Sequence, residues 1–580
     1  MKASRSLIFL VPVLLLPLPA QAASDLGKVD FPTSGSPAAQ AHFLRGVAAL
    51  HSFWYDEAAD AFHAAQEAEP GFAMAYWGEA MTYNHPIWSE QDLEAARTAL
   101  KRLAPDRETR QAKAPTEREK GFLDAVEILY GEGDKPARDA AYAEAMRKVH
   151  ERWPDDLEAA SFYALSRIGP ALTGPPGEER RRTLIQAAAL LEDLFIRNPQ
   201  HPGVLHYLIH AYDDPLFAPL GLRAARAYAR VAPAAHHALH MPSHIFVQLG
   251  DWDSTASSNE ASWAASVDWV KRRGLAIDKE DFHSLSWLAY AYLQQGRYGK
   301  AREALETVRQ AARQSNSPRI AEAVQGMEAR YAIETRTWGK TAPAAKAAVG
   351  SEGGCHGAGA MSHGRAEGAQ LLATGLGAAR SGDLAKAEDA ATRLRSLAGQ
   401  GGEGYRGGGG AVMEKEVSAA VLLAKGKAGE ALKLLAEAAE LEARMGPPSG
   451  PPETIKPAQE LYGEALLEQG QAKEAAQQFA QALLRMPNRA ASLLGSARAA
   501  AKLGDAAAAR GFYAKLAEIW RQADSSLAEL AEVKGYLATS ASPAAPAPRA
   551  TAPRPERGER WRGGRGLAAN SSSVRRRAGR

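Results

Sequence analysis

The sequence contains a single cysteine, Cys355, among 580 residues. One thiol cannot form an intrachain disulfide, and it cannot supply the thiolate clusters that hold many structural zinc ions. The CxxCH motif for haem attachment is also absent. Packing alone must therefore stabilise the fold, and a metal site in this chain would need nitrogen or oxygen ligands.

Long apolar runs are missing after the N-terminus. The run from Leu7 to Leu18 is too short to span a bilayer, and no later stretch reaches the roughly 18 apolar residues that a transmembrane helix needs. Lys2 and Arg5 precede this first run and Ala20-Gln21-Ala22 follows it, which is typical of a cleaved secretory signal. We expect residues 1–22 to be a signal peptide and the mature protein to be soluble, without a transmembrane segment, and periplasmic or secreted.

Familiar catalytic signatures are missing as well. No GxSxG elbow, phosphate-binding loop or GxGxxG motif opens a helix after a strand, and the alternating pattern of strands is almost absent. The segment HYLIH, residues 206–210, lacks the glutamate of an HExxH metalloprotease helix. The sequence therefore predicts no catalytic residue, and an enzyme here would be an unfamiliar metal enzyme with histidine ligands.

The net charge of +3 is the sum of a basic C-terminal tail and a mildly acidic remainder. Residues 541–580 contain ten arginines, two glutamates and no lysine, a net charge of +8 that leaves −5 for the rest of the chain. This tail is rich in Pro, Ala, Gly and Ser, so it cannot bury apolar surface and is predicted to be disordered. The mildly acidic body excludes the interpretation of a basic, nucleic-acid-binding fold.

A repeat is what the sequence does contain. Small residues, an aromatic residue and a closing proline recur at fixed spacing near both ends, at Gly46, Ala58, Phe62, Ala65 and Pro70, and at Gly463, Leu466, Gly470, Ala475, Phe479, Ala482 and Pro487. Four of the later positions recur 34 residues further on as Gly504, Ala509, Tyr513 and Leu516. The spacing resembles that of the tetratricopeptide repeat family across most of residues 38–520.

This resemblance implies an all-α protein, an α-solenoid of helix–turn–helix repeats. The segments ALHSFWYDEA, AMAYWGEAM and HMPSHIF are further similar to a subgroup of exported bacterial proteins without an established activity. We expect an N-terminal solenoid over 38–349, a glycine-rich linker over 350–365 and a C-terminal solenoid over 366–540. The segments 104–115 and 169–178 are expected to be a charged linker and a Pro/Gly loop.

Histidines gather in one part of the array. Seven of the fifteen lie between Asn198 and Asp253, and the pairs His206/His210 and His240/His244 are 34 residues apart. Within each pair the i, i+4 spacing places both rings on one face of a helix. His237 and His283 each stand thirteen residues before a glycine, so three successive repeats direct imidazoles at a shared surface.

These residues form a candidate metal site. The proposed ligands are His206, His210, His237, His240, His244, His283 and Asp213. Imidazoles with one carboxylate suit zinc, copper(II), nickel or non-haem iron. Asp213 or its neighbour Asp214 is expected either to bind the ion or to accept the second N–H of a bound imidazole. The family resemblance places this set on the concave face of the solenoid.

Other interpretations stay open at this point. The same groove could bind a peptide or protein partner without metal, or the histidines could form a structural hydrogen-bond network. Pro242 breaks a helix that would carry both His240 and His244, which puts His240 on the shared face in doubt. We expect His51 and His85 to be exposed polar side chains. The leading hypothesis is an exported scaffold whose histidine-lined groove binds a transition metal, a protein partner or both.

Overall fold

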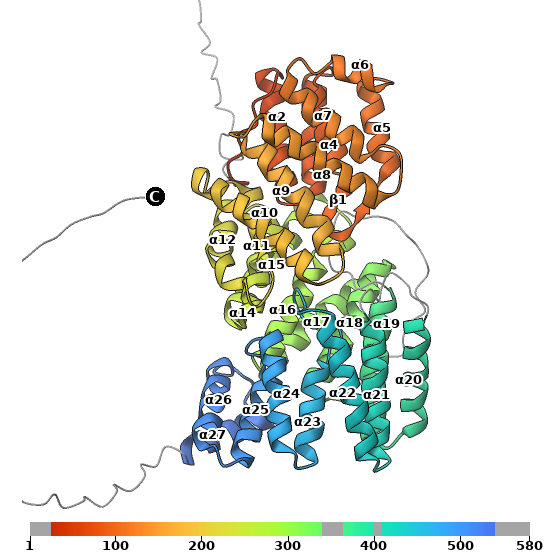
Figure 1. Cartoon of the computed structure of the whole chain (residues 1–580), viewed down its shortest axis with the longest axis vertical. Coiled ribbons are helices and arrows are strands. Elements are labelled where there is room, and N and C mark those ends of the chain that lie inside the picture. Colours follow the sequence, from red (N-terminus) through yellow and green to blue (C-terminus); the bar gives the residue numbers. More distant parts are fainter. Residues whose placement is uncertain (1–24, 339–362, 400–407, 540–580) are drawn as a thin grey trace, which may run out of the picture.

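The protein is an array of antiparallel helices (Figure 1). This computed structural model describes residues 25–338, 363–399 and 408–539. The predicted signal peptide, the tail at 541–580 and residues 350–362 of the predicted linker lie outside the described residues. Within them the all-α prediction is confirmed, and no described helix is long and apolar enough to cross a membrane.

The first half of the chain runs through α2 to α12 and includes one small hairpin. Its helices are α2 (Pro37–His51), α3 (Tyr55–Ala68), α4 (Ala73–Met81), η1 (Pro86–Trp88), α5 (Leu93–Leu103), α6 (Arg107–Ala112), α7 (Glu117–Leu129), α8 (Lys135–Arg152), α9 (Leu157–Thr173), α10 (Glu178–Arg197), α11 (Pro202–Ala211) and α12 (Ala218–Val231). Strands β1 (Asn84–His85) and β2 (Glu90–Gln91) pair antiparallel around η1, with Asn84 opposite Gln91.

The second half is helical throughout its described residues. It comprises α13 (His236–His240), α14 (Pro242–Leu249), α15 (Trp252–Arg273), η2 (Ile277–Lys279), α16 (Phe282–Gln294), α17 (Tyr298–Gln314), α18 (Pro318–Thr335), α19 (His363–Ser381), α20 (Leu384–Gly399), α21 (Gly409–Ala424), α22 (Ala428–Arg444), α23 (Ala458–Glu468), α24 (Ala472–Arg485), α25 (Ala490–Lys502), α26 (Ala506–Ile519) and α27 (Ala528–Thr539).

The repeat packing predicted from the small and aromatic residues is present at both ends of the array. The ring of Phe62 in α3 lies against Gly46 of α2 and Gly78 of α4, where an added Cβ would approach the ring to 2.6 and 2.2 Å. Phe479 in α24 occupies the same position between α23 and α25, against Gly463 and Gly495. An aromatic ring between two helices without side chains at that point lets neighbouring repeats pack closely. The fold is a tetratricopeptide-type solenoid.

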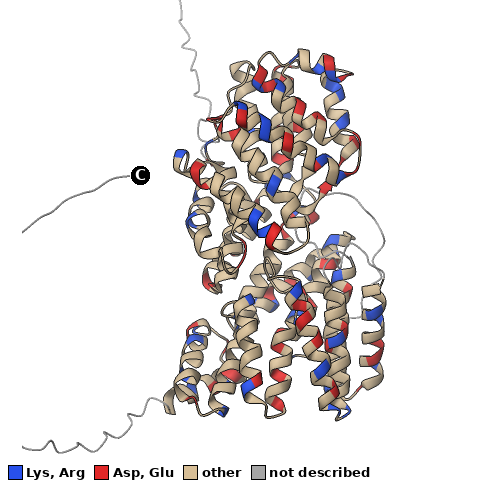
Figure 2. Cartoon of the chain, in the orientation of Figure 1, with Lys and Arg blue, Asp and Glu red and all other residues tan. Residues whose placement is uncertain are grey.

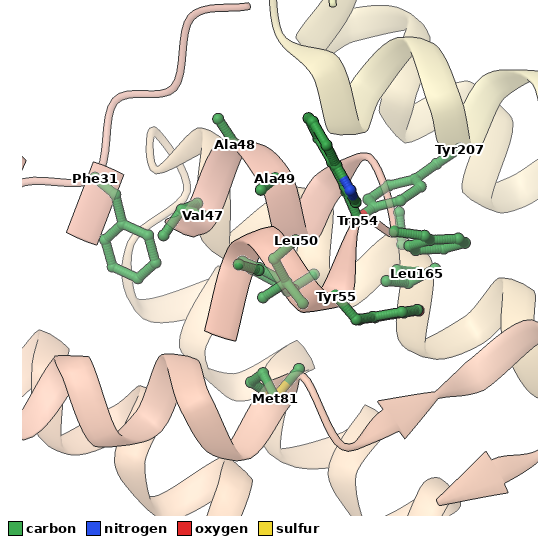
Figure 3. Packing of buried hydrophobic residues seen from close by; sticks show 14 of the residues in the cluster. Phe31, Val47, Ala48, Ala49, Leu50, Trp54, Tyr55, Met81, Leu165 and Tyr207 are labelled. Atoms are coloured by element: carbon green, nitrogen blue, oxygen red, sulfur yellow. The ribbon is translucent and has the colours of Figure 1, made fainter. Parts of the chain in front are cut away.

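The largest core joins the first helices to α9 and α11. Leu50, Tyr55, Met81 and Leu165 come from four helices and pack together with Tyr207 in one apolar cluster (Figure 3). Two interruptions are shorter than expected. Helix α6 forms inside the predicted linker at 104–115 with Asp106 as its N-cap, and α9 continues through Pro170 to Thr173. Pro170 lies in the last turn of α9, where it removes one helical hydrogen bond without ending the helix.

The C-terminal helices fold back onto the middle of the array. The indole of Trp520 donates to the carbonyl of Gln294 at 3.0 Å, and Trp252 donates to the carbonyl of Asn488 at 2.9 Å. Arg489, which is buried, forms ion pairs with Glu334 of α18 at 2.7 Å and Glu460 of α23 at 2.8 Å. The helices before and after the predicted linker therefore share buried contacts. Charges of both signs are interspersed along the helices (Figure 2).

Glu416 in α21 is a buried carboxyl group whose two oxygens have no hydrogen-bond partner. Burial raises its pKa well above the usual value of 4.5, and the nearby Glu442 adds to the effect. A pKa raised by folding gives stability that is present below about pH 4.5 and is lost as pH rises through the folded value. Glu416→Met should therefore increase the free energy of unfolding at pH 8 by about 1–3 kcal/mol, because a desolvated polar group is removed.

Scanning calorimetry at pH 5 and pH 8 measures this effect. The gain in melting temperature should be larger at pH 8. Glu440→Met, which changes an exposed glutamate on α22, serves as the matched control and should shift the melting temperature little at either pH. An equal response of the two variants would contradict the interpretation of Glu416 as an unpaired buried acid.

Candidate metal centre

The six predicted histidines converge, but in two groups of three. The first triad is His206, His210 and His237, and the second triad is His240, His244 and His283. In each triad, one ligand atom from every histidine lies within 4.8 Å of the corresponding atoms of the other two. The sequence predicts that all six imidazole rings meet at one site. The structure instead forms two neighbouring triads, with 5.9 Å between the ring centroids of His237 and His240.

Four helices from successive repeats carry the rings. His206 and His210 lie on α11, which begins at Pro202 with the His201 ring accepting from the N–H of Val204. The helix is interrupted at Met241, between α13 and α14, as Pro242 predicts. His240 nevertheless remains beside His244 because Met241 keeps helical backbone angles, φ −54° and ψ −36°. Asp281 caps α16 through the N–H of Ser284 and thereby positions His283 in the first turn.

The second triad has the tighter geometry. The Nε2 atom of His240 lies 3.2 Å from Nε2 of His244 and 3.1 Å from Nε2 of His283. Two nitrogens bound to one tetrahedral zinc ion at 2.0–2.1 Å would lie about 3.3 Å apart. The observed separations are therefore close to those of ligands around a common ion.

Hydrogen bonds on the far side of the rings fix which nitrogen carries the proton. Nδ1 of His240 lies 2.7 Å from Oδ1 of Asn259, and the Asn259 amide is oriented by its own bond to the carbonyl of Thr255 at 2.8 Å. Nδ1 of His244 lies 2.7 Å from Oδ2 of Asp213. Both partners are acceptors, so each Nδ1 is the donor. Burial lowers the pKa of His240, so its Nε2 atom carries a lone pair, which faces Nε2 of His244 at 3.2 Å.

The first triad is also oriented by a hydrogen bond on its far side. Nδ1 of His206 donates to the carbonyl of His51 at 2.7 Å, and its Nε2 faces Nε2 of His210 at 3.1 Å. Within the described residues, the buried Nε2 atom of the third member, His237, has no hydrogen-bond partner. Buried polar atoms in folded proteins are nearly always paired, so this nitrogen is a candidate ligand atom.

Burial favours the neutral form of four of these rings. Desolvation lowers the pKa of His206 to about 3, and it lowers the pKa values of His210, His237 and His240 well below 6.5. Repulsion from neighbouring histidines acts in the same direction at His210 and His240. A neutral imidazole is the form that binds a metal ion.

One aromatic ring covers each triad. Phe53 lies 4.3 Å from the ring centroid of His206, and its backbone has the left-handed φ of 51° that a bulky residue rarely adopts. Trp287 lies 4.5 Å from His244 and 4.9 Å from His240. We had expected a stripe of histidines on an exposed concave groove. The structure instead buries His206, His210 and His240, because these aromatic rings and α15 pack over them.

Asp213 lies behind His244 and is not a member of either triad. Its Oδ2 atom accepts from His244, and its Oδ1 atom accepts from the side chain of Gln248 at 2.8 Å. It therefore orients a ring of the second triad. Asp214 instead accepts from the backbone N–H of Leu216 at 2.8 Å.

A third cluster was missed from the sequence. His51, Glu158 and His201 are buried together, although we had expected His51 to be exposed. Glu158 accepts from His51 at 2.7 Å and from His201 at 3.0 Å, and the remaining nitrogen of His51 lies 2.8 Å from the hydroxyl of Tyr207. Every ring nitrogen here is paired, so this cluster is a structural hydrogen-bond network. No repeat spacing relates its members, which removes the signal that revealed the triads.

Comparisons with known proteins add little beyond the fold. No family model matches the chain, and no curated protein matches it. Solved structures similar to it include the Cut9-Hcn1 complex (12% identity, 81% of this chain and 78% of that chain, TM-score 0.33) and yeast Tom70 (13%, 87% and 95%, 0.26). Human IFIT1 is similar at 13% identity over 85% and 92%, with a TM-score of 0.35. The fold assignment rests on the helix pairs and glycine contacts described above.

Proposed function

We propose that this solenoid binds two transition-metal ions, one in each triad. The observation that carries the proposal is the convergence of three imidazole nitrogens, because Nε2 of His240 lies 3.2 Å from Nε2 of His244 and 3.1 Å from Nε2 of His283. These separations are close to those of ligands around one ion. An ion at this point would be bound by rings from α13, α14 and α16.

The ligand atoms in the two triads limit which ions can bind. Each triad offers imidazole nitrogens and no thiolate, which suits zinc, copper(II), nickel or non-haem iron. Three protein ligands leave a fourth position open, as in catalytic rather than purely structural zinc sites. Whichever ion binds, the outer acceptors Asn259, Asp213 and the His51 carbonyl hold the rings in the orientation that it needs.

Burial favours a metal ion over the peptide hypothesis. A peptide in a concave groove would have to reach rings that Phe53 and Trp287 cover. A metal ion needs only a narrow path to neutral nitrogens. Secretion of the protein is a separate part of the proposal and rests on residues 1–22, outside the described residues.

Elemental analysis tests the proposal directly. Protein expressed without a histidine tag and exchanged into metal-free buffer should retain close to two transition-metal ions per chain. Protein that contains no metal, and whose melting temperature does not respond to added zinc or copper, would contradict it.

Asp213→Asn should weaken metal binding at the second triad alone. The asparagine loses the charge that strengthens the bond from Nδ1 of His244, and such outer partners typically change metal affinity by about 10–100-fold. Competition with a chromophoric chelator should resolve one weakened and one unchanged site. Asp214→Asn is the control, since that carboxylate bonds to backbone. Equal weakening of both sites would show a general structural effect instead.

A further inference from the structure

A cavity of about 180 Å³ lies beside the second triad. It is an open pocket lined by α16, α18, the first turn of α19 and the loop at 445–457, and both His283 and Trp287 line it. Trp287 therefore separates the cavity from the rings of His240 and His244, while His283 belongs to both the cavity wall and the triad. A molecule in the cavity would lie next to whatever the second triad binds.

Arg330 gives this cavity an unusual wall. Its Nη1 atom is buried and has no hydrogen-bond partner. Among the described residues, its guanidinium makes one long hydrogen bond from Nη2 to the carbonyl of Pro452, at 3.4 Å, and lies over the ring of Tyr290 at 5.1 Å. Desolvation lowers the pKa of this arginine, and the charge of nearby Glu334 acts in the opposite direction. Within the described part of the chain no carboxylate forms an ion pair with Arg330, and a buried guanidinium nitrogen without an acceptor requires explanation.

Charged side chains of both signs line the cavity. Arginines 319, 330 and 365 are on the wall together with glutamates 322 and 453. Arg365 has Glu453 at 4.0 Å. Arg330 is the one of these arginines with a buried guanidinium nitrogen that lacks an acceptor among the described residues, and the cavity it lines is large enough for a small organic molecule.

The loop that closes the cavity is connected to the second triad. The backbone of Gly450 lies so close to Trp287 that an added Cβ would come within 2.3 Å of the indole. The side chain of Gln248 donates both to the carbonyl of Pro448 and to Asp213, each at 2.8 Å. Asp213 orients His244. A ligand in the cavity and an ion in the second triad would therefore both depend on the contacts of Gln248 and Asp213.

We propose that this cavity binds a small organic molecule with a carboxylate group, which pairs with Arg330 and lies against Trp287 at the edge of the second triad. Among the described residues Nη1 has no acceptor, and a carboxylate beside a guanidinium accepts two parallel hydrogen bonds, one from each of two guanidinium nitrogens. The flat indole of Trp287 provides the apolar wall. The placement of the ligand next to a metal ion rests on the proposed function, whereas its pairing with Arg330 does not.

Calorimetric titration of the full chain tests the proposal. The probes are acetate, succinate and benzoate, compared with the neutral succinamide and benzamide and with inorganic phosphate, each titrated into metal-loaded and chelator-treated protein. At least one carboxylate should bind, and its amide should bind at least tenfold more weakly. Arg330→Gln should reduce the carboxylate affinity at least tenfold without lowering the metal content or the melting temperature. Arg302→Gln, on the exposed side of α17, should leave all three unchanged.

The outcomes separate the two proposals. Binding of none of the carboxylates, equal binding of acids and amides, or an unaffected Arg330→Gln variant would overturn the carboxylate site even if two metal ions are present. Tighter binding of phosphate than of any carboxylate would overturn the ligand class. Carboxylate binding that depends on Arg330 in a chain without metal would support the site and contradict the metal centre alone.

Discussion

Protein carrying His240→Ala is expected to retain one metal ion per chain where the unaltered protein holds two. His240 supplies the nitrogen that lies 3.1–3.2 Å from both other members of the second triad, so its loss leaves only two imidazoles around that ion. The first triad keeps its three rings. Removal of a ligand from a three-histidine site should lower the affinity of that site at least a hundredfold, since outer-shell changes alone cost about 10–100-fold. Plasma mass spectrometry after gel filtration measures the ratio.

Stability should follow metal content. An ion that binds only the folded chain contributes about 4 kcal/mol at a free concentration of 1,000 Kd, so chelation should lower the melting temperature of the unaltered protein more than that of His240→Ala. His206→Ala should lose the first ion instead, and the double variant should lose both. His42→Ala changes an exposed histidine on α2 and should bind two ions. Loss of both ions from His240→Ala alone would show that the triads are not independent sites.

Glu158→Ala is expected to lower the free energy of unfolding by about 3–5 kcal/mol. The carboxylate is buried and accepts from His51 and His201, and its removal leaves both ring N–H groups without an acceptor inside the core. Urea denaturation measures the loss. Glu158→Gln, which keeps one acceptor oxygen, should lose less. Equal stability of Glu158→Ala and the unaltered protein would contradict the role assigned to this network.

The pH dependence of the same variant has a definite sign. Burial acts to raise the pKa of Glu158, but the charges and hydrogen bonds of His201 and His51 outweigh it and hold the pKa below the usual 4.5. The stability that this carboxylate contributes is therefore present above about pH 4.5 and is lost as pH falls through the folded value. The difference between Glu158→Ala and the unaltered protein should shrink in acid.

Glu158 should also affect metal binding, through His51. The carbonyl of His51 accepts from Nδ1 of His206, so disorder at His51 releases one ring of the first triad. Glu158→Ala should weaken the first site and leave the second unchanged. Gly203 has a related role, because a Cβ there would come within 2.3 Å of the His51 ring.

The sequence predicted the convergence of the histidines because a regular spacing along the chain places residues at equivalent positions in successive repeats. Residues 34 apart occupy equivalent places in adjacent repeats, so His206 and His240 had to lie on neighbouring helices with their i, i+4 partners. The division into two triads was not predictable. It depends on His237 grouping with the histidines of α11 while His240, three residues later on α13, groups with His244 and His283.

The sequence pattern also did not predict that the histidines are buried. The periodicity of α11 separates the His206 stripe from the apolar stripe, which indicates an exposed face for a helix seen alone. In the fold that second face meets Phe53, which lies about 150 residues earlier in the chain and is held in a left-handed conformation that no local pattern signals. The partnership of His51 with Glu158 and His201 similarly joins residues 43 to 107 positions apart.

The placement of the triads across α11, α13, α14 and α16 has a mechanical consequence. Small rotations between stacked repeats add up to changes in the curvature of a solenoid. Ions held by histidines from successive repeats would cross-link these repeats and stiffen this stretch, while the repeats beyond it stay flexible. A force that straightens the solenoid would pull the rings apart and release the ions, so tension would lower metal occupancy.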